Sequence, residues 1–304
     1  MKGSFEKILK LAQEAETLTI AVAVAQDPDV LRSLRSAADL KLVHPLLIGD
    51  EAEIKRVARD NAIDVTGFPI IDEPDKVACC NRAVTLTSQG KAHVVMKGIV
   101  DTSSVLRAAL NKDYGLRDAP LLNHVGIFEL DNVDRLLFMS DGAMNLLPNV
   151  DQKQAIIENT QRVTKVFGVE NPIAACICAM EKVNPKMQCT LDAVELVKRN
   201  EEGKLTGCRV VGPLGLDNAV FTDAAVHKGI MNPLAGRADI LLMPNIEAGN
   251  ILYKTLIFIS GARSASALVG AKAPLVITSR ADADDVKLNS IALAMVMAGR
   301  KLKE

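Results

Sequence analysis

The chain has 304 residues, of which 49% are hydrophobic and 24% charged, a composition typical of a soluble globular protein rather than a disordered one. Its 36 basic and 37 acidic residues give a net charge of −1, so no basic excess favours a general nucleic-acid or anionic-membrane surface. The longest apolar runs are much shorter than the roughly 20 residues that cross a bilayer, and the amino-terminal helix-like stretch carries charges throughout, unlike a secretory signal. We therefore expect a cytoplasmic protein without a nucleic-acid or membrane partner.

The first half of the chain alternates between apolar runs and helix-like patterns. Strands are predicted over residues 18–25, 42–49, 68–72 and 93–98, and a helix follows each of them, the third ending near Gly90. Strands that alternate with helices of this length indicate βαβ units and a mainly parallel sheet.

The middle of the chain has a different pattern. The apolar runs 124–130 and 135–142 flank a polar turn, which predicts an antiparallel hairpin. A helix is predicted after Pro148, with Asp151 as its N-cap, Gln154 completing a capping box and Gly168 at its end. Strands over 173–180 and 208–213 enclose another helix, and no repeat or flexible linker interrupts the pattern.

Two stretches of the last quarter, 239–254 and 275–285, have the same organisation. In each, an apolar strand-like run breaks at a polar turn and a helix-like pattern follows. Ligands of open α/β sheets bind at such turns after strand carboxyl ends. In the final helix, the spacing places five apolar residues toward the core: Leu288, Ile291, Ala292, Met295 and Val296.

The turn that contains Ser279 and Arg280 is a candidate anion site. Backbone N–H groups at the start of a helix favour an anion, and an arginine adds a two-pronged donor. The structural alternative is that Asp282 caps the helix, that Asp284 and Asp285 occupy its first turn, and that the arginine pairs with one of them. A Mg²⁺ site built from these acids is less favoured than helix capping.

The segment 244–254 places Gly249 where a helix begins, among Asn245, Glu247 and Asn250. A glycine there costs about 1 kcal/mol relative to alanine, which indicates a close backbone approach; turn chemistry alone is the alternative. Lys254 lies four residues after Asn250 on the same helix face and points either to the same place or to solvent.

A further candidate anion site lies in the segment 96–110. Lys97 ends a strand, Thr102 and Ser103 begin a helix, and Arg107 lies one turn further along. An ordinary N-cap is the alternative for this pattern. The two glycines of the segment 210–220 lack the third glycine of a dinucleotide-binding loop, so we reject that interpretation.

Metal binding is not expected from the cysteines and histidines. The six cysteines (79, 80, 176, 178, 189 and 208) form no CxxC pair and are interpreted as core residues. The four histidines lack a metal-binding spacing as well, and only the role of His124 stays open.

Five stretches together resemble the phosphate acetyltransferase/phosphate butyryltransferase family. They are MKGIVDTSSVLR, SDGAMN with LPNVDQKQAIIENT, VVGPLGLDNAV, AGRADILLMPNIEAGNILYK and ITSRADADD, and they extend in family order over nearly the whole chain. The form GARSASALVGAKAPLVITSRAD and the short chain resemble the butyryl branch more than the acetyl branch.

The resemblance implies two α/β domains of the isocitrate/isopropylmalate dehydrogenase-like type, with mainly parallel sheets and the active site in the interdomain cleft. The expected domains are 1–124 plus 269–304, completed by the C-terminal helix, and 125–268. The implied reaction is reversible transfer of a short-chain acyl group between coenzyme A and inorganic phosphate, by direct attack without a covalent enzyme intermediate. Acyl-CoA and phosphate or acyl phosphate are the implied partners, with coenzyme A as a substrate, no metal and no tightly bound cofactor. A homo-oligomer, either a dimer or a multiple of dimers, is also implied.

The resemblance assigns catalysis to Ser279 and Arg280 directly, and substrate binding to Arg107 by its place in TSSVLR. The family's catalytic aspartate falls at Val286 in acetyl-type spacing, so Asp284 and Asp285 are the nearest candidates. We interpret Lys97, Thr102, Ser103, Asn245, Glu247, Gly249, Asn250 and Lys254 as further substrate-binding residues. A phosphate acetyltransferase is the near alternative. A decarboxylating dehydrogenase of the same fold and a non-catalytic acyl-CoA or phosphate-binding protein are the distant ones.

Overall fold

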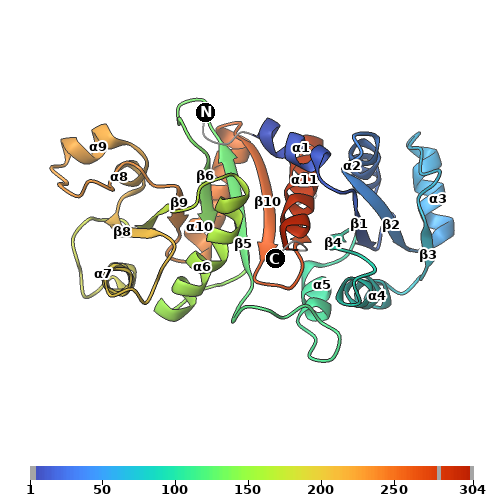
Figure 1. Ribbon diagram of the computed structural model, residues 1–304, viewed down its shortest axis with the longest axis horizontal. Helices are drawn as coiled ribbons and strands as arrows, with labels where there is room; N and C mark the ends of the chain where they lie inside the picture. Colours follow the sequence, from blue (N-terminus) through green and yellow to red (C-terminus); the bar gives the residue numbers. More distant parts are fainter. Residues whose placement is uncertain (1–4, 279–281, 302–304) are drawn as a thin grey trace. The chain divides into compact units, whose positions relative to one another are not determined.

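The computed structural model describes residues 5–278 and 282–301 (Figure 1). The chain forms two compact units, which we call the central unit (Ala119–Ser264) and the terminal unit (Phe5–Asp118 with residues 265–304). The domain boundaries expected at 124/125 and 268/269 stay a prediction. Among the described residues, no helix is both long and apolar enough to cross a membrane.

The terminal unit alternates strands and helices as the sequence predicts. Its elements are α1 (Phe5–Glu14), β1 (Leu18–Ala23), α2 (Pro28–Asp39), β2 (Val43–Gly49), α3 (Glu51–Asp60), β3 (Ile70–Asp72), α4 (Lys76–Ser88), β4 (Val94–Lys97), α5 (Thr102–Ala109), β11 (Leu275–Val276) and α11 (Asp284–Lys301). Strand β10 (Arg263–Val269) enters this unit at residue 265. The strand order is β3-β2-β1-β4-β11-β10, and neighbouring strands pair in parallel except β10 with β11, which are antiparallel.

Local sequence explains where these helices begin and which faces they bury. The side chains of Asp27, Asp50 and Asp75 each accept a backbone N–H in the first turn of α2, α3 and α4, the usual N-cap interaction. Helix α11 packs against α1 and α2 (Figure 1). Ile291, Ala292, Met295 and Val296 of α11 are buried, as predicted for the core face of the C-terminal helix, whereas Leu288 is half-buried.

The central unit begins with the predicted hairpin. Its elements are β5 (Asn123–Glu129), β6 (Leu137–Ser140), α6 (Val150–Val166), β7 (Ile173–Ile177), α7 (Gln188–Glu201), β8 (Arg209–Leu214), α8 (Leu216–Val220), α9 (Thr222–His227), β9 (Ile240–Leu242), α10 (Ile246–Lys254) and the π-helical turn η1 (Thr255–Ile259). The strand order is β5-β6-β9-β7-β8, and β5 pairs with β6 antiparallel while the other pairs are parallel. Apolar side chains from these strands form the core with Tyr253 of α10.

The predicted start of α6 is wrong by two residues. The helix begins at Val150, and its capping box joins Asn149 and Gln152, each of which accepts the other's backbone N–H. The expected pair, Asp151 and Gln154, fits the same sequence pattern but lies within the first two turns. Two overlapping matches cannot be separated by pattern alone, because either one satisfies the N-terminal N–H groups.

Candidate active site

Three strands of the terminal unit end side by side at one edge of its sheet. Strand β4 lies between β1 and β11, and Met96 is opposite both Val22 and Val276. Because the carboxyl ends of parallel strands meet at the same edge, residues 24–27, 98–101 and 277–278 follow these strands as neighbours. The Lys97 and Thr278 segments, which the sequence singled out separately, therefore belong to one edge.

Backbone packing at this edge is tight. The N–H of Gly98 donates to Ala23 O at 2.8 Å, and a Cβ on Gly98 would lie only 2.0 Å from Val24 O. Val24 itself is buried and has a φ of +59°, a conformation that β-branched residues rarely adopt. Such a backbone costs about 1 to 3 kcal/mol and persists only where the surrounding packing imposes it. The edge is thus a rigid and strained turn.

Lys97 places a buried positive charge beside that turn. Its side chain is 8% exposed, and Nζ donates to the carbonyl oxygens of Gly98 at 3.2 Å and Val100 at 3.3 Å. The ammonium group therefore holds the loop that leads into α5. It can favour an anion at the edge through its charge while its donors act on the loop.

The start of α5 differs from an ordinary side-chain cap. The N-cap residue is Asp101, but its side chain makes no capping hydrogen bond. Thr102, the first helical residue, is half-buried, and Ser103 is exposed. Arg107 is exposed and lies in the last turn of α5, whereas Thr102 and Ser103 lie at the start of this helix.

Ser279 and Arg280 lie outside the described residues, so their predicted roles stay a hypothesis. Asp284 and Asp285 are the first two residues of α11, and both are exposed. Asp284 Oδ2 lies 3.9 Å from Arg32 Nη1, and Asp285 Oδ1 accepts the backbone N–H of the next residue at 2.9 Å.

Another acid of this segment is buried. Asp282 is 5% exposed, and its carbonyl oxygen accepts a short hydrogen bond from Lys287 Nζ, whose side chain is also buried. A shielded carboxylate therefore lies just before α11, and two exposed ones lie in its first turn.

The central unit has a comparable edge where β6 and β9 end. Ser140 is opposite Leu242 in this parallel pair, and polar turns follow both strands. Asp141, which is 2% exposed, accepts four N–H groups: Oδ1 from the backbone of Ala143 (2.8 Å) and Met144 (3.1 Å), and Oδ2 from the backbone (3.1 Å) and side chain (2.6 Å) of Asn145. These donors satisfy a buried carboxylate and fix the shape of the turn.

Helix α10 docks onto this turn through the predicted glycine. A Cβ on Gly249 would lie 2.2 Å from Asp141 O, which confirms the expected close approach and identifies the neighbour as the chain's own backbone. Asn245 caps the helix by accepting the Ala248 N–H at 2.9 Å. Asn250 Nδ2 donates to the carbonyl oxygen of Gly142 at 3.2 Å. The structure therefore brings Asn245, Gly249 and Asn250 together around one turn.

Glu247 and Lys254 are not part of this contact. Both are exposed, and Lys254 Nζ lies 5.7 Å from the centre of the Phe258 ring on η1. Glu247 occupies the first turn of α10, where its negative charge suits the helix dipole. Of the two directions left open for Lys254, the structure shows the exposed one.

His124, whose role the sequence left open, lies in the same part of the central unit. Its ring packs edge-on against Tyr253 with centroids 5.2 Å apart, and its buried Nδ1 has no hydrogen-bond partner among the described residues. Burial lowers the pKa of His124, while the negative charge of Asp141 opposes that shift. Because the effect of burial is the larger of the two, the imidazole of His124 is neutral.

Sequence reasoning missed Asp141 and Asn145 as site residues. Both lie in SDGAMN, which was noted only as part of the family resemblance. The signal was available, since this polar turn directly follows an apolar strand, as the turn at 244–250 does.

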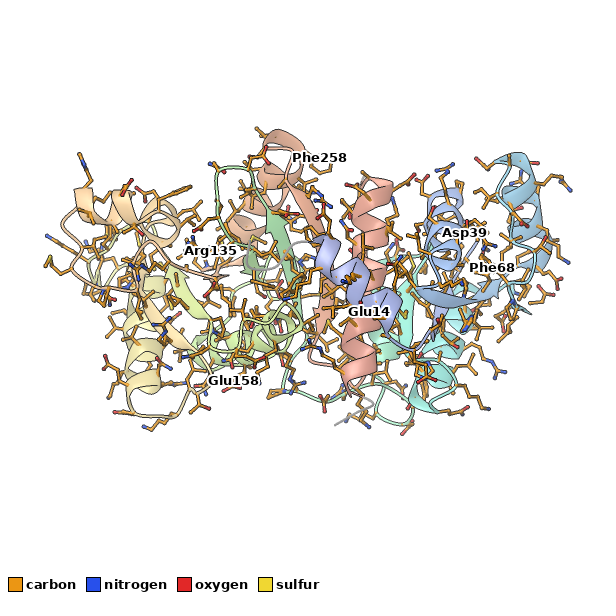
Figure 2. All side chains as sticks on the ribbon, turned by 45° about the horizontal axis from the view of Figure 1, so that its top comes forward. Glu14, Asp39, Phe68, Arg135, Glu158 and Phe258 are labelled. Atoms are coloured by element: carbon orange, nitrogen blue, oxygen red, sulfur yellow. The ribbon has the colours of Figure 1, made fainter. Side chains whose placement is uncertain are left out.

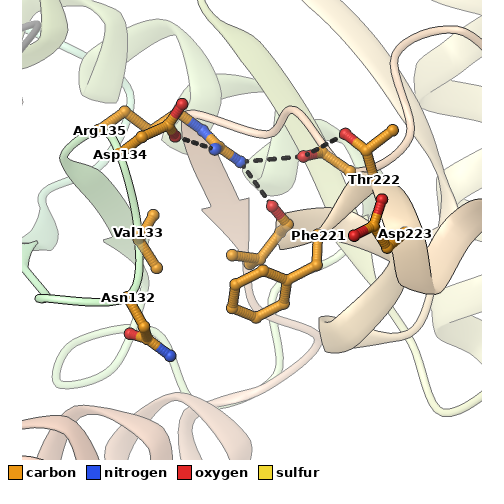
Figure 3. A pocket seen from close by; sticks show the side chains of 9 residues that line it. Asn132, Val133, Asp134, Arg135, Phe221, Thr222 and Asp223 are labelled. Carbon is orange, nitrogen blue, oxygen red and sulfur yellow. Dashed lines mark hydrogen bonds and ion pairs between the residues drawn. The ribbon is translucent and has the colours of Figure 1, made fainter.

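A hollow of the central unit lies at the opposite ends of β6 and β9, where these strands begin (Figure 3). It has a volume of about 270 Å³ between the β5–β6 turn and the start of α9. Arg135 donates there to Asp134 and to the carbonyl oxygens of Val220, Gly236 and Ala238. Because the guanidinium group of Arg135 donates hydrogen bonds to these loops, few of its N–H groups are left for a ligand.

Five of the six cysteines are buried, as predicted, and Cys189 is half-buried. Burial raises the pKa of Cys79 to about 11 and that of Cys176 to about 12, so both thiols stay protonated. In the parts of the chain that the structure describes, no three His, Cys, Asp or Glu side chains are grouped as a metal site.

Comparison with known proteins gives matches over the full chain. The sequence matches the family described as Phosphate acetyl/butaryl transferase over residues 4–80 and 76–295. A phosphate butyryltransferase of Clostridium acetobutylicum is 46% identical, covering 99% of this chain and 100% of that protein. A phosphate acetyltransferase of Thermotoga maritima is 41% identical, covering 96% of this chain and 99% of that protein.

Solved structures agree with the expected fold. A branched-chain phosphotransacylase from Enterococcus faecalis V583 is similar with a TM-score of 0.82 and 30% identity, covering 93% of this chain and 99% of that chain. A 4-hydroxythreonine-4-phosphate dehydrogenase from Burkholderia phymatum shares the fold with a TM-score of 0.54 and 15% identity, covering 92% of this chain and 98% of that chain. The expected dehydrogenase-like α/β fold with mainly parallel strands is confirmed.

Proposed function

This chain belongs to the phosphate acetyl/butaryl transferase family, and we propose that it transfers a short-chain acyl group, preferably butyryl, reversibly between coenzyme A and inorganic phosphate. The observation that carries the proposal is similarity over the full length to named phosphate butyryltransferases. A phosphate acetyltransferase is the second candidate, because a relative with that name is similar over nearly the same length. The two differ in the acyl chain and share the chemistry.

The reaction joins a phosphate oxygen to the thioester carbonyl carbon and breaks the carbon–sulfur bond. Negative charge develops on the carbonyl oxygen and then on the sulfur of the departing coenzyme A. Arg280 stabilises this charge and Ser279 donates a hydrogen bond to it; loss of one such donor costs about 3 to 4 kcal/mol. No covalent enzyme intermediate is needed when both substrates are held together, since that alignment alone supplies about 7 to 11 kcal/mol.

In the reverse direction a base must take the proton of the coenzyme A thiol. Asp284 or Asp285 is the base suggested by the family spacing. Proton transfer from a thiol is easier for a carboxylate that is shielded from water, because burial disfavours its charged form. Asp282 meets this condition better, being 5% exposed, and is a third candidate.

Anion binding is assigned to the edge of the terminal unit. Lys97 supplies a nearby charge, Thr102 and Ser103 supply hydroxyl donors at the start of α5, and the exposed Arg107 is free to contact a phosphate group. These groups suit inorganic phosphate or a phosphate of coenzyme A, since charge-assisted hydrogen bonds are the strong ones.

Residues of α10 are assigned to positioning and contact with substrate. Asn245, Gly249 and Asn250 set the turn at the edge of the central unit, and exposed Glu247 and Lys254 are available to a ligand. Coenzyme A is a substrate in this scheme, and no tightly bound cofactor takes part. The proposal includes a cytoplasmic location and assembly as a homo-oligomer.

Phosphate-dependent release of coenzyme A tests the function. Butyryl-CoA and acetyl-CoA are each incubated with the protein and phosphate, a thiol reagent measures free coenzyme A, and a blank lacks phosphate. Faster release from butyryl-CoA supports the proposal, and faster release from acetyl-CoA moves the protein to the second candidate. No phosphate-dependent release from either substrate would sink the catalytic assignment.

Single substitutions then test the reactive segment. We expect Arg280→Ala and Ser279→Ala to lower turnover by about 100-fold or more without lowering the melting temperature. Asn substitutions of Asp282, Asp284 and Asp285 identify the base, because only one of them should abolish turnover. A fully active Arg280→Ala protein would contradict the assignment.

A further inference from the structure

We infer that the terminal unit carries a second anion-binding site, distinct from the strand carboxyl ends, which takes a phosphate monoester with a flat apolar body. The site is a groove of about 670 Å³ at the amino-terminal end of β1 and β2. Its floor is formed by those two strands, and its walls by the end of α2 and the loop 66–69 before β3. Pockets that hold small organic ligands have volumes of about 300 to 1,000 Å³.

The groove exists because helices leave the sheet uncovered where β1 and β2 begin. Thr19 is opposite His44 where β1 and β2 begin to pair. His44 is exposed although β2 lies between two other strands, and Thr19 and Leu46 are only half-buried. Strands of parallel sheets are normally covered on both faces, so an uncovered polar floor is unusual.

The lining of the groove has one sign of charge. Arg35 and Lys41 contribute two cations, His44 adds a ring nitrogen, and Thr19 adds a hydroxyl group. Thr17 and Thr66 also line the groove, but their hydroxyl groups donate to Lys41 O and to Asp64. No acidic residue lines it, although the chain as a whole has a net charge of −1. A concave surface with one sign of charge concentrates ions of the opposite sign.

Arg35 is held in place without using all its donors. Its Cζ lies 4.9 Å from the centre of the Phe68 ring, and Nη2 donates to Asp39 Oδ1 at 2.6 Å. Its buried Nε has no acceptor among the described residues. Asp39 and Phe68, both labelled in Figure 2, thus fix one guanidinium group near the end of α2. A planar, pre-oriented donor of this kind suits a phosphate or carboxylate.

Two carboxylates oppose an anion here and limit its affinity. Asp39 and Asp64 line the adjacent hollow on α2 and the loop after α3, not the groove itself. Hydrogen bonds from Thr66 lower the pKa of Asp64, and the charge of Arg35 contributes to the same shift, so this carboxylate stays ionised. The ligand must therefore draw on Lys41 and His44 as well as Arg35.

The apolar side of the groove selects the rest of the ligand. Leu46, Phe68 and Pro69 line it beside the cationic groups. A bare inorganic ion would leave this surface in contact with water, whereas a flat apolar body attached to the phosphate would cover it. A nucleoside monophosphate has both parts, because the faces of its flat base are apolar.

Isothermal titration calorimetry with AMP, adenosine and inorganic phosphate tests the inference on the full chain. We expect AMP to bind at one site that saturating coenzyme A does not block, adenosine not to bind, and phosphate to bind there more weakly than AMP. Arg35→Gln should weaken AMP binding by about 10- to 100-fold, the usual worth of a hydrogen bond to a charged group. Arg59→Gln is the matched control, because Arg59 is exposed on α3 and does not line the groove.

The following outcomes overturn the inference. Absence of AMP binding, equal affinity in the wild type and Arg35→Gln, or an equal loss in Arg59→Gln would each exclude a site built on Arg35. AMP binding that coenzyme A abolishes would place AMP in a coenzyme A site instead. If Arg35→Gln lowers the melting temperature, the double variant Lys41→Gln/His44→Gln replaces it, with the same expected loss. The result does not depend on acyl transfer, so the two proposals fail separately.

Discussion

Replacing Gly249 by alanine separates the packing role of this residue from its helix propensity. In an open helix position, glycine to alanine stabilises a protein by about 1 kcal/mol. At residue 249 the added Cβ would lie 2.2 Å from Asp141 O, 2.8 Å from Gly142 Cα and 3.0 Å from Asp141 C, whereas ordinary contacts begin at 3.4 Å. All three neighbours are backbone atoms, so no side-chain rotation can relieve the contact.

The helix must therefore move away from the turn by about 1 Å, at the cost of overpacking. Such costs are about 1 to 3 kcal/mol, and a backbone contact belongs at the upper end. After the gain in propensity, we expect a net loss of about 2 kcal/mol, which lowers the melting temperature of a unit of this size by about 4 to 8 °C. The same movement stretches the 3.2 Å hydrogen bond from Asn250 to Gly142 O.

Gly299→Ala is the matched control. Gly299 is also helical, in α11, but the nearest atom to its added Cβ would be Leu18 Cδ1 at 3.9 Å. This variant should be more stable than the wild type by up to about 1 kcal/mol. Thermal and urea unfolding of both variants measure the difference. A Gly249→Ala protein as stable as Gly299→Ala would refute the reasoning, because the close approach would then have no energetic consequence.

Two further predictions concern buried charges in the central unit. Lys153→Met leaves Asp192, its buried partner at 2.7 Å, without a counter-charge. We expect urea unfolding to show that the free energy of unfolding falls by about 3 to 5 kcal/mol and that the double variant Lys153→Met/Asp192→Leu largely recovers it. A Lys153→Met protein as stable as the wild type would contradict this. Because burial lowers the pKa of His124, the unfolded chain takes up a proton that the folded chain resists. The stability from neutral His124 is thus fully present above about pH 6.5 and is lost as the pH falls below that value. His124→Gln should flatten the decline in melting temperature from about pH 6.5 to 5, and an unchanged slope would exclude the effect.

Strand and helix order could be predicted because the signals are local. Alternation of apolar runs and helical periodicity needs only neighbouring residues, and the hairpin and the C-terminal helix followed from the same kind of pattern. The start of α6 shows the limit of this method. Asn149 and Asp151 both fit a capping pattern, and only the packing of the whole helix decides which of them lies at its end.

Side-chain partners in the candidate site could not be predicted, because they join segments that are distant in sequence. The glycine signal at Gly249 was readable, but its neighbour, Asp141, lies more than a hundred residues earlier in the chain. The four donors to Asp141 come from its own turn, and a closer inspection of SDGAMN would have suggested that turn. Arg107 and Lys254, by contrast, fit their motifs yet are exposed on helix surfaces.

Gly98, which follows β4, and Gly249, which lies in α10, have one physical explanation. Gly98 packs on Val24 O in the terminal unit, and Gly249 packs on Asp141 O in the central unit, each at a distance that any side chain would prevent. In both places a segment that precedes or begins a helix is pressed against the backbone of the neighbouring turn. The glycines therefore fix the turns through contacts with the chain's own backbone. For a reaction that depends on aligning two bound molecules within about 0.5 Å, such rigidity matters more than any single donor.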